Sequence, residues 1–449
     1  MRGIRRFIWL AFMLGSATGV AHAWSHHAWG TWLSLSVMPD ARSADAAVRA
    51  EPLERFLIEQ GAALEAVLQQ EEQWARSKVR NYPARPEVLA YRFDPHADPA
   101  ELRRRFLMAL RVHPATPLPL HVQVLPLPAS QTAYAARPSM SWSEVSLHKE
   151  EPPLPRRHVA VKEGEWVSLL DVISTATDEP DDGMDSGLWT DSGTEHGRVY
   201  GFGRQPLSER YGKYGDESPL HMGFFHESAS TYATANGLRR TYPDYRMHLW
   251  QTLARHALVN GHPYWGWRFA GWAMHYAQDL TQPYHTSFMP ARGALGVAWM
   301  NVLDMAGVSD SRQQASQVVA NRQHLLELYQ QQSMLLPMQK GEMDHPNLKP
   351  FMSVTSDAGR MALPEYGLRD IVALQAHRHA DEIDAWVTAS FPARWVNDPH
   401  ANLSKEATGA MYQQMQSKSP PALEGLDQKL RELSQHFGTA TRAIWRRLQ

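Results

Sequence analysis

Apolar positions recur along this chain at the spacing of buried and amphipathic helices. Over residues 53–74 they follow a period close to 3.6, at Leu53, Phe56, Leu57, Leu64, Val67 and Leu68. Similar patterns predict helices over residues 29–37, 101–112, 166–175, 225–236, 245–259, 265–274, 294–306, 312–336, 363–389 and 423–448. No repeat or heptad array accompanies them. The pattern therefore predicts an all-α protein built as a helical bundle.

A proline-rich stretch interrupts this pattern between residues 77 and 165, with a short alternating run at 121–125. Because proline lacks the N–H that helices and inner strands need, we expect an irregular insertion that can include a small β element or a lid. Helical patterning returns and continues through residues 340–449, a helical C-terminal extension. We therefore expect one α-helical domain over residues 24–449.

The first 23 residues have the composition of a secretory signal. Three arginines precede a short apolar stretch, and Ala21-His-Ala23 forms an A-x-A cleavage site. The apolar stretch is too short to span a membrane. We expect cleavage after Ala23 and a secreted or periplasmic protein that begins at Trp24.

Charge and composition narrow the chemistry. Removal of the first 23 residues would leave 42 basic against 47 acidic residues, a net charge of −5, which gives no reason to expect a nucleic-acid partner. The chain has no cysteine, which excludes disulfides and thiolate metal sites. Any metal ion must be held by His, Asp, Glu or backbone groups, and the 22 histidines favour such a site.

The most specific motif is His275-Tyr-Ala-Gln-Asp279-Leu-Thr-Gln282-Pro283-Tyr-His285. His275 and Asp279 stand four apart and would share one face of a helix. Pro283 cannot continue that helix, so the chain must turn, and His285 can point back towards the pair. Two imidazoles and a carboxylate at a helix end are typical ligands of zinc and related metals. The alternative is a core helix with two hydrogen-bonded histidines; the fixed spacing favours the metal site.

The expected new N-terminus is a second candidate. The α-amine and carbonyl of Trp24 could form a five-membered chelate, which His26 or His27 could complete. The alternative is a frayed terminus that carries a histidine pair.

Together, Trp24, the early histidine and the His-x3-Asp-x2-Gln-Pro-x-His motif resemble the zinc-dependent phospholipase C and single-strand nuclease superfamily. Those enzymes are all-α, and their trinuclear zinc site includes the N-terminal amine and carbonyl. The resemblance covers the core site, and the motifs here lie further apart than in compact members. It implies zinc as the cofactor, with three ions per chain as in that trinuclear site.

Further ligands follow from the resemblance. The stretch Glu-Pro-Asp-Asp-Gly-Met-Asp favours Asp181, with Asp178 and Asp182 as rivals and an acidic surface turn as the alternative. The stretch Ser-Pro-Leu-His-Met-Gly-Phe-Phe-His resembles the Pro-Leu-His-Tyr element of the nucleases and favours His221 over His226.

The last pair of the family is His-x3-Glu or His-x3-Asp. This chain offers His324-Leu-Leu-Glu327, at a spacing of three, which still keeps both residues on one helical face.

The resemblance implies a role for each ligand. Asp279 would bridge two zinc ions, and Asp181 could also act as a base. One ion of the bridged pair would be held by Trp24 and the early histidine, the other by Asp181, His221 and His275, and the third ion by His285, His324 and Glu327.

The resulting hypothesis is a secreted, zinc-dependent phospholipase C that cleaves glycerophospholipids such as phosphatidylcholine and contacts the membrane surface transiently. The downstream acid is Glu, as in the phospholipases, and the fungal and plant nucleases usually carry disulfides, which this chain lacks. The alternatives are a single-strand nuclease or other phosphoesterase, and a secreted non-enzymatic protein with one structural zinc. The sequence gives no oligomeric state.

Overall fold

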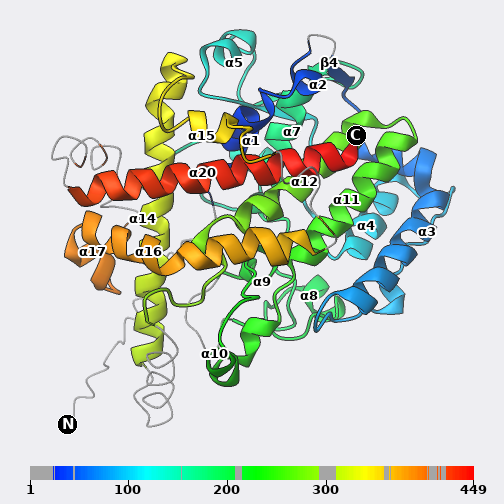
Figure 1. Cartoon of the computed structure of the whole chain (residues 1–449). Coiled ribbons are helices and arrows are strands. Elements are labelled where there is room, and N and C mark those ends of the chain that lie inside the picture. The colour runs from blue at the N-terminus through cyan, green and yellow to red at the C-terminus, as the bar shows by residue number, and fades with distance from the viewer. Residues whose placement is uncertain are drawn as a thin grey trace, which may run out of the picture.

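A helix rich in aromatic residues, α12 (Pro263–Asp279), lies at the centre of the fold and carries the His-x3-Asp motif (Figure 1). Pro263 stands in its first turn, where a missing N–H costs nothing, and the helix contains no β-branched residue. Fifteen of its 17 residues are buried. It packs against α7 (Leu169–Asp178), α11 (Pro243–Val259) and α20 (Pro421–Leu448), which enclose it.

This computed structural model describes residues 24–449 except positions 25, 44–45, 153, 208–214, 293–309, 358–363, 365, 402, 404–411, 413–414 and 416–420. The expected signal sequence and the helix expected at 294–306 lie outside the described residues. Other described helices are α1 (His27–Leu35), α2 (Pro39–Arg42), α3 (Leu53–Lys78), α4 (Pro99–Leu110), α5 (Pro128–Ala133), α6 (Trp142–Val145), α8 (Glu195–Val199), α9 (Ser218–His221), α10 (Ala229–Thr234), α14 (Asp310–Lys340), α15 (Lys349–Met352), α16 (Leu374–Ser390) and α17 (Ala393–Asn397). Short 3-10 helices are η1 (Glu87–Leu89), η2 (Glu179–Asp182), η3 (Asn236–Arg239) and η4 (Pro283–His285), and η5 (Leu368–Ala373) is a π-helical turn.

The prediction of a mostly helical, all-α protein is confirmed, and the insertion does contain small β elements. The strands β2 (His121–Val124) and β3 (Arg157–Ala160) pair antiparallel, with Val122 opposite Val159. A second pair joins β1 (Ala47–Arg49) to β4 (Trp166–Ser168). Part of one prediction was wrong: the helix expected from residue 166 begins only at residue 169. The alternation of Trp166, Val167 and Ser168 between exposed and buried positions is that of a strand.

Two helix predictions also differ in detail. The helix expected over 225–236 is divided into α10 and η3, and the helix expected over 363–389 opens as the π-helical turn η5 before α16. The other predicted helices that fall on described residues match within about five residues, mostly at the helix ends. The pattern did not predict the short helices α2, α5, α6, α8, α9, α15 and α17. None of the described helices is long and apolar enough to cross a membrane.

The close approach of α12 to α7 depends on Gly271. A Cβ atom at this position would lie 2.6 Å from Ala176 Cβ and 2.8 Å from the carbonyl oxygen of Ile173. Contacts this short do not occur between real side chains, so any larger residue must push the helices apart. Because α7 leads directly into η2, this contact also sets the distance between η2 and the end of α12.

We expect Gly271→Ala to lower the free energy of unfolding by about 1–3 kcal/mol, because the added methyl group overpacks the interface. Helix propensity alone would favour alanine by about 1 kcal/mol, so the sign of the change separates packing from propensity. Urea unfolding measures it, with Gln73→Ala on the exposed face of α3 as the control. A stabilised Gly271→Ala variant would contradict the packing argument.

Candidate metal centre

Five side chains from four segments converge at the C-terminal end of α12. We call them the His–Asp cluster: His27 of α1, Asp181 of η2, His221 of α9, and His275 and Asp279 of α12. Asp279 Oδ1 lies 3.3 Å from His27 Nε2, and Asp279 Oδ2 lies 2.9 Å from His221 Nδ1 and 3.2 Å from His275 Nε2.

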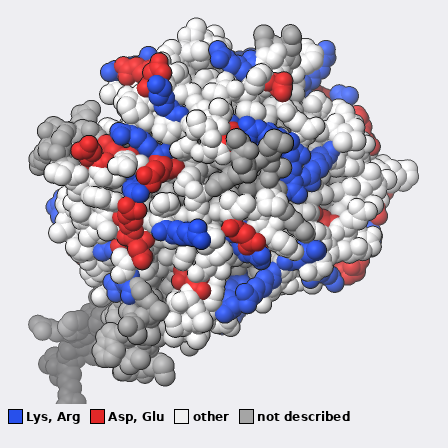
Figure 2. All heavy atoms as spheres, in the orientation of Figure 1, with Lys and Arg blue, Asp and Glu red and all other residues white. Residues whose placement is uncertain are grey.

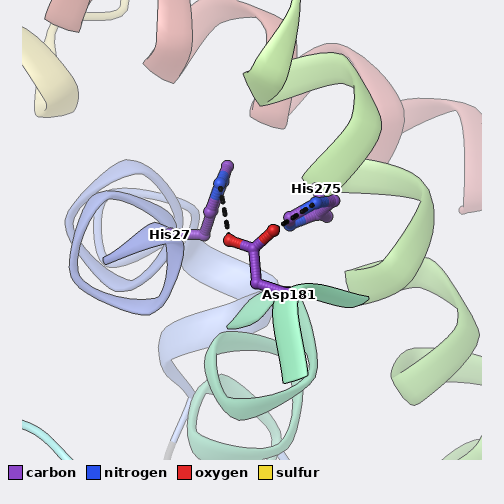
Figure 3. Close-up of side chains that lie close together, drawn as sticks. All are labelled: His27, Asp181 and His275. Atoms are coloured by element: carbon purple, nitrogen blue, oxygen red, sulfur yellow. Dashed lines mark ion pairs between the residues drawn. The ribbon is translucent and has the colours of Figure 1, made fainter. Parts of the chain in front are cut away.

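Asp181, in η2, faces the same three histidine rings as Asp279. Its Oδ2 lies 3.8 Å from His27 Nε2, and its Oδ1 lies 3.6 Å from His275 Nε2 (Figure 3). The same Oδ1 lies 3.7 Å from His221 Nδ1. Each carboxylate thus turns one oxygen to His27 and the other to the His221 and His275 rings.

The turn that carries Asp181 is fixed by α12 itself. Glu179 accepts hydrogen bonds from Arg268 Nε (2.9 Å), Arg268 Nη2 (2.7 Å) and Trp272 Nε1 (2.6 Å). Burial alone would raise the pKa of Glu179, but the Arg268 guanidinium outweighs it and lowers that pKa. This buried ion pair holds η2 against the helix that supplies His275 and Asp279.

The first described residues are held against the ends of α12 and α7 by hydrogen bonds. The Trp24 indole Nε1 donates to the carbonyl oxygen of Gln278 (3.2 Å) and to Thr281 Oγ1 (3.1 Å). The backbone N–H of Ala28 donates to Asp178 Oδ1 (3.1 Å), which ties the first turn of α1 to the end of α7. These contacts place His27 over the end of α12.

Each cluster histidine has an acceptor oxygen beside the ring nitrogen that faces away from the cluster. His275 Nδ1 lies 2.8 Å from the carbonyl oxygen of Thr177, and His27 Nδ1 lies 2.8 Å from Gln278 Oε1. His221 Nε2 lies 3.3 Å from Asp185 Oδ2. An oxygen at this position favours a proton on the outer nitrogen, which leaves the inner nitrogen able to bind a metal ion. This arrangement is typical of metal-ligating histidines. The inner nitrogens of His221 and His275 lie 2.9 Å apart, so one proton joins them when no ion is bound.

The acceptor of His27 is itself oriented. Gln278 Nε2 donates to Thr31 Oγ1 of α1 (2.8 Å) and to Thr441 Oγ1 of α20 (3.0 Å). These donations leave Gln278 Oε1 facing His27, since the amide nitrogen is turned the other way. The first and last helices thus jointly determine the orientation of this amide.

The cluster is strongly coupled electrostatically. Burial alone would lower the pKa values of His27 and His221, but neighbouring carboxylates outweigh it and raise both pKa values. Burial alone would raise the pKa of Asp279, but His275, His221 and His27 hold that pKa well below its ordinary value. Protons and a metal ion would therefore compete for the same lone pairs.

Arginines pair with the outer carboxylates of the site. Arg246 Nη2 donates to Asp185 Oδ1 (2.6 Å), and Arg156 pairs with Asp182 and, at 3.4 Å, with Asp178. The ion pairs recorded for Asp181 and Asp279 are instead with histidine rings. Buried carboxylates at this position favour either protonated imidazoles or a bound cation.

The residues present fit a metal ion. Two trios, His27–Asp181–His275 and His221–His275–Asp279, each place ligand atoms within 4.8 Å of one another. Within the described residues, the buried atoms His27 Nε2 and Asp279 Oδ1 have no hydrogen-bond partner. Imidazole nitrogen and carboxylate oxygen suit zinc and other divalent transition metals. The cluster can therefore hold a metal ion.

The predicted turn after α12 is confirmed, and the structure shows why the motif has a glutamine at position 282. The helix ends at Asp279, and Pro283 opens η4. Gln282 Oε1 accepts from the backbone N–H of Tyr284 (2.7 Å), which caps η4. His285 then lies with Nδ1 3.1 Å from the carbonyl oxygen of His221, and burial lowers its pKa to about 4.

The sequence predicted His324 beside His285, and the structure has Gln323 there. Gln323, and not His324, contacts both His285 Nε2 (3.0 Å) and Glu327 Oε1 (2.8 Å). Burial raises the pKa of Glu327 well above its ordinary value, and Gln282 lies 3.4 Å from the same carboxylate oxygen. We call His285, Gln323 and Glu327 the glutamine bridge.

Other candidates lie outside the trios. His26 packs against Trp29 with ring centroids 4.1 Å apart and the rings tilted by 49°, and it contacts Gln331 of α14. His226 Nε2 lies 2.7 Å from the carbonyl oxygen of Arg369. Among the rivals, the structure therefore brings His27, His221 and Asp181 together, and not His26, His226, Asp178 or Asp182.

Sequence reasoning missed the residues that orient the ligands. Gln323 stands four positions before Glu327, so the family spacing alone could have indicated it. Asp185 lies in the same acidic stretch as Asp181, and Gln278 directly precedes Asp279. No sequence pattern marks either residue as one that orients a ligand. The pair of Glu179 with Arg268, 89 residues apart, has no sequence signal at all.

The cluster is nearly enclosed by the described residues. His275 and Asp279 side chains are 0% exposed, whereas the Asp181 side chain is 9% exposed. A cavity of about 840 Å³ lies between residues 343–353 and α20, and neither this nor a smaller one near His226 is lined by cluster residues. Asp181 is thus the cluster carboxylate most accessible to solvent.

Comparisons with protein-family models, with curated proteins and with solved structures found no match for this chain. The assignment of a metal centre therefore depends on the geometry of the cluster. The likeness to the phospholipase C and nuclease superfamily stays a prediction from motifs.

We expect His275→Gln to lower the zinc content, because His275 belongs to both trios and its Nε2 is the ligand atom that they share. His248→Gln is the matched control: that ring pairs with Glu71 (2.8 Å) and stacks on Trp74, away from the cluster. Native mass spectrometry reports ions per folded chain. Retention of the full zinc content by His275→Gln would contradict this ligand assignment.

We expect one additional residue ahead of Trp24 to reduce zinc content and activity relative to protein that begins at Trp24, because it removes the α-amine from the chelate. Trp24→Phe in a protein that begins at residue 24 is the comparison, since it deletes the indole hydrogen bonds and keeps the amine. Equal zinc content in the extended and unextended proteins would exclude Trp24 as an amine ligand.

Proposed function

We propose that this chain is a zinc-dependent phosphodiester hydrolase of the phospholipase C type. The observation that carries the proposal is the convergence of three imidazole nitrogens and two carboxylates, with an acceptor oxygen beside the far nitrogen of every ring. A site built only for packing would not need to fix three tautomers. The sequence motifs add the particular class of enzyme.

Asp279 and Asp181 are suited to span two ions. Each directs one oxygen towards His27 and the other towards the His221 and His275 rings, so each carboxylate faces both trios. Bound zinc ions supply Lewis acids for the phosphate oxygens and lower the pKa of a bound water towards about 7.

The chain's own residues would orient the reaction. The side chains of His275 and Asp279 are fully enclosed, so water and substrate must reach the centre from another side. Asp181, whose side chain is 9% exposed, is the less buried of the two cluster carboxylates, which suits a role in accepting a proton from the attacking water. The hydrogen bonds of Glu179 to α12 would keep Asp181 in position during that transfer.

A lipid phosphodiester fits this chain better than a polynucleotide does. Acidic and basic side chains both occur on the face in Figure 2, and most of that surface is uncharged. A nucleic-acid substrate calls for a basic tract along its path. The proposal accordingly includes export, a phospholipid substrate and transient contact with a membrane surface.

We expect the zinc-loaded protein starting at Trp24 to release phosphocholine and diacylglycerol from phosphatidylcholine in mixed micelles. Chelation should remove the activity and zinc should restore it, because the attacking water needs a metal ion to lower its pKa. Asp181→Asn should lower kcat at least tenfold while the protein stays folded, whereas Asp171→Asn on α7, whose carboxylate accepts from Tyr134 (2.7 Å), is the control.

The reaction products distinguish a phospholipase C from other phosphodiester hydrolases. Phosphatidic acid in place of diacylglycerol, or cleavage of single-stranded DNA with no phosphocholine release, would contradict the proposal. Zinc-independent hydrolysis would contradict the metal mechanism.

A further inference from the structure

The amide of Gln323 lies where the resemblance expects a third metal ion. Its Nε2 atom is 3.0 Å from His285 Nε2 and 2.8 Å from Glu327 Oε1. A single amide nitrogen thus joins the two atoms that the family pattern assigns to one zinc.

The hydrogen bonds of the glutamine bridge are chemically consistent without a cation. His285 Nδ1 faces the carbonyl oxygen of His221, so its proton resides there and Nε2 is an acceptor. A carboxylate oxygen of Glu327 is also an acceptor. An amide NH₂ group has two donors, and both acceptors are within its reach. The amide therefore presents its nitrogen, not its oxygen, to this position.

Helix geometry explains why His324 does not take this place. Gln323 and Glu327 stand four apart on α14 and share one face, whereas His324 is rotated by roughly 100° from Gln323 about the helix axis. The position four before Glu327 is the one that carries histidine in a His-x3-Glu pair. This chain has glutamine there, and a neutral amide is not among the usual protein ligands of zinc.

The His–Asp cluster still supplies ligands for two ions. The two trios share His275, whose Nε2 can bind only one ion, so His27 is left for the other ion. Asp181 and Asp279 each direct one oxygen to either side. Each of the trios within the His–Asp cluster offers three His or Asp ligand atoms in mutual reach. Within the part of the chain that the structure describes, no such trio includes His285 or Glu327.

We propose that this chain holds two metal ions, both in the His–Asp cluster, and that the Gln323 amide replaces the third. The inference rests on the proposed function, since it concerns the same site, and it narrows that function to a dinuclear centre. The side of the centre near His285 then offers a hydrogen-bonded protein surface in place of a cation.

Native mass spectrometry of the full-length mature protein, loaded with zinc and freed of excess, counts the ions per folded chain. We expect two for the wild type. Gln323→His should bind three, because it places an imidazole four positions before Glu327. The matched control is His324→Ala, which should stay at two.

A wild-type count of three would overturn the inference, and so would a His324→Ala variant that has lost one ion. Gln323→Ala provides a second readout if Gln323→His does not fold: it should also hold two ions. If Gln323 serves as a ligand through its oxygen, Gln323→Ala will lose an ion, which contradicts the inference.

The outcomes separate this inference from the proposed function. Two ions without phosphocholine release would support the dinuclear centre and contradict the phospholipase. Three ions with phosphocholine release would support the phospholipase and contradict the dinuclear centre. A count of one or none would contradict both.

Discussion

The structure depends on the burial of carboxylates at the C-terminal end of α12. The partial negative charge of a helix C-terminus disfavours an acid such as Asp279, and burial raises the cost further. Arginines neutralise the surrounding acids Glu179, Asp182 and Asp185, but the inner carboxylates face imidazoles. The fold tolerates this charge only if protons or cations compensate it, so that the stability of the core and the occupancy of the site are linked.

Packing and chemistry share the same residues. Gly271 lets α12 approach α7, and this approach brings the Thr177 carbonyl oxygen to His275 and the η2 turn to Asp279. Glu179 then fastens that turn to α12 through Arg268. Removal of one partner of such a buried pair typically costs about 3–5 kcal/mol, so it would disturb the cluster without touching a ligand.

The sequence predicted the helical class, the central helix, the turn at Pro283 and the stretches that supply Asp181 and His221. Those predictions depend on periodicity and on the backbone limits of proline, which are local properties. The choice between His26 and His27, or between Gln323 and His324, depends on which way each helix faces, and only the packing of α1 and α14 decides that. Strand β4 was read as helix because three residues carry too little periodicity to tell. The orienting contacts of Gln278 and Asp185 join distant segments and leave no local trace.

The cluster gathers residues from position 27 to position 279, and the amide of Gln278 links it to Thr441 in α20. An ion held by His27, Asp181, His221 and Asp279 would close loops of tens to hundreds of residues at one point. Such closures restrict the unfolded chain, as a disulfide does, and the effect grows with the logarithm of loop length. In a protein that has no cysteine, this centre would serve as the covalent-like cross-link of the fold.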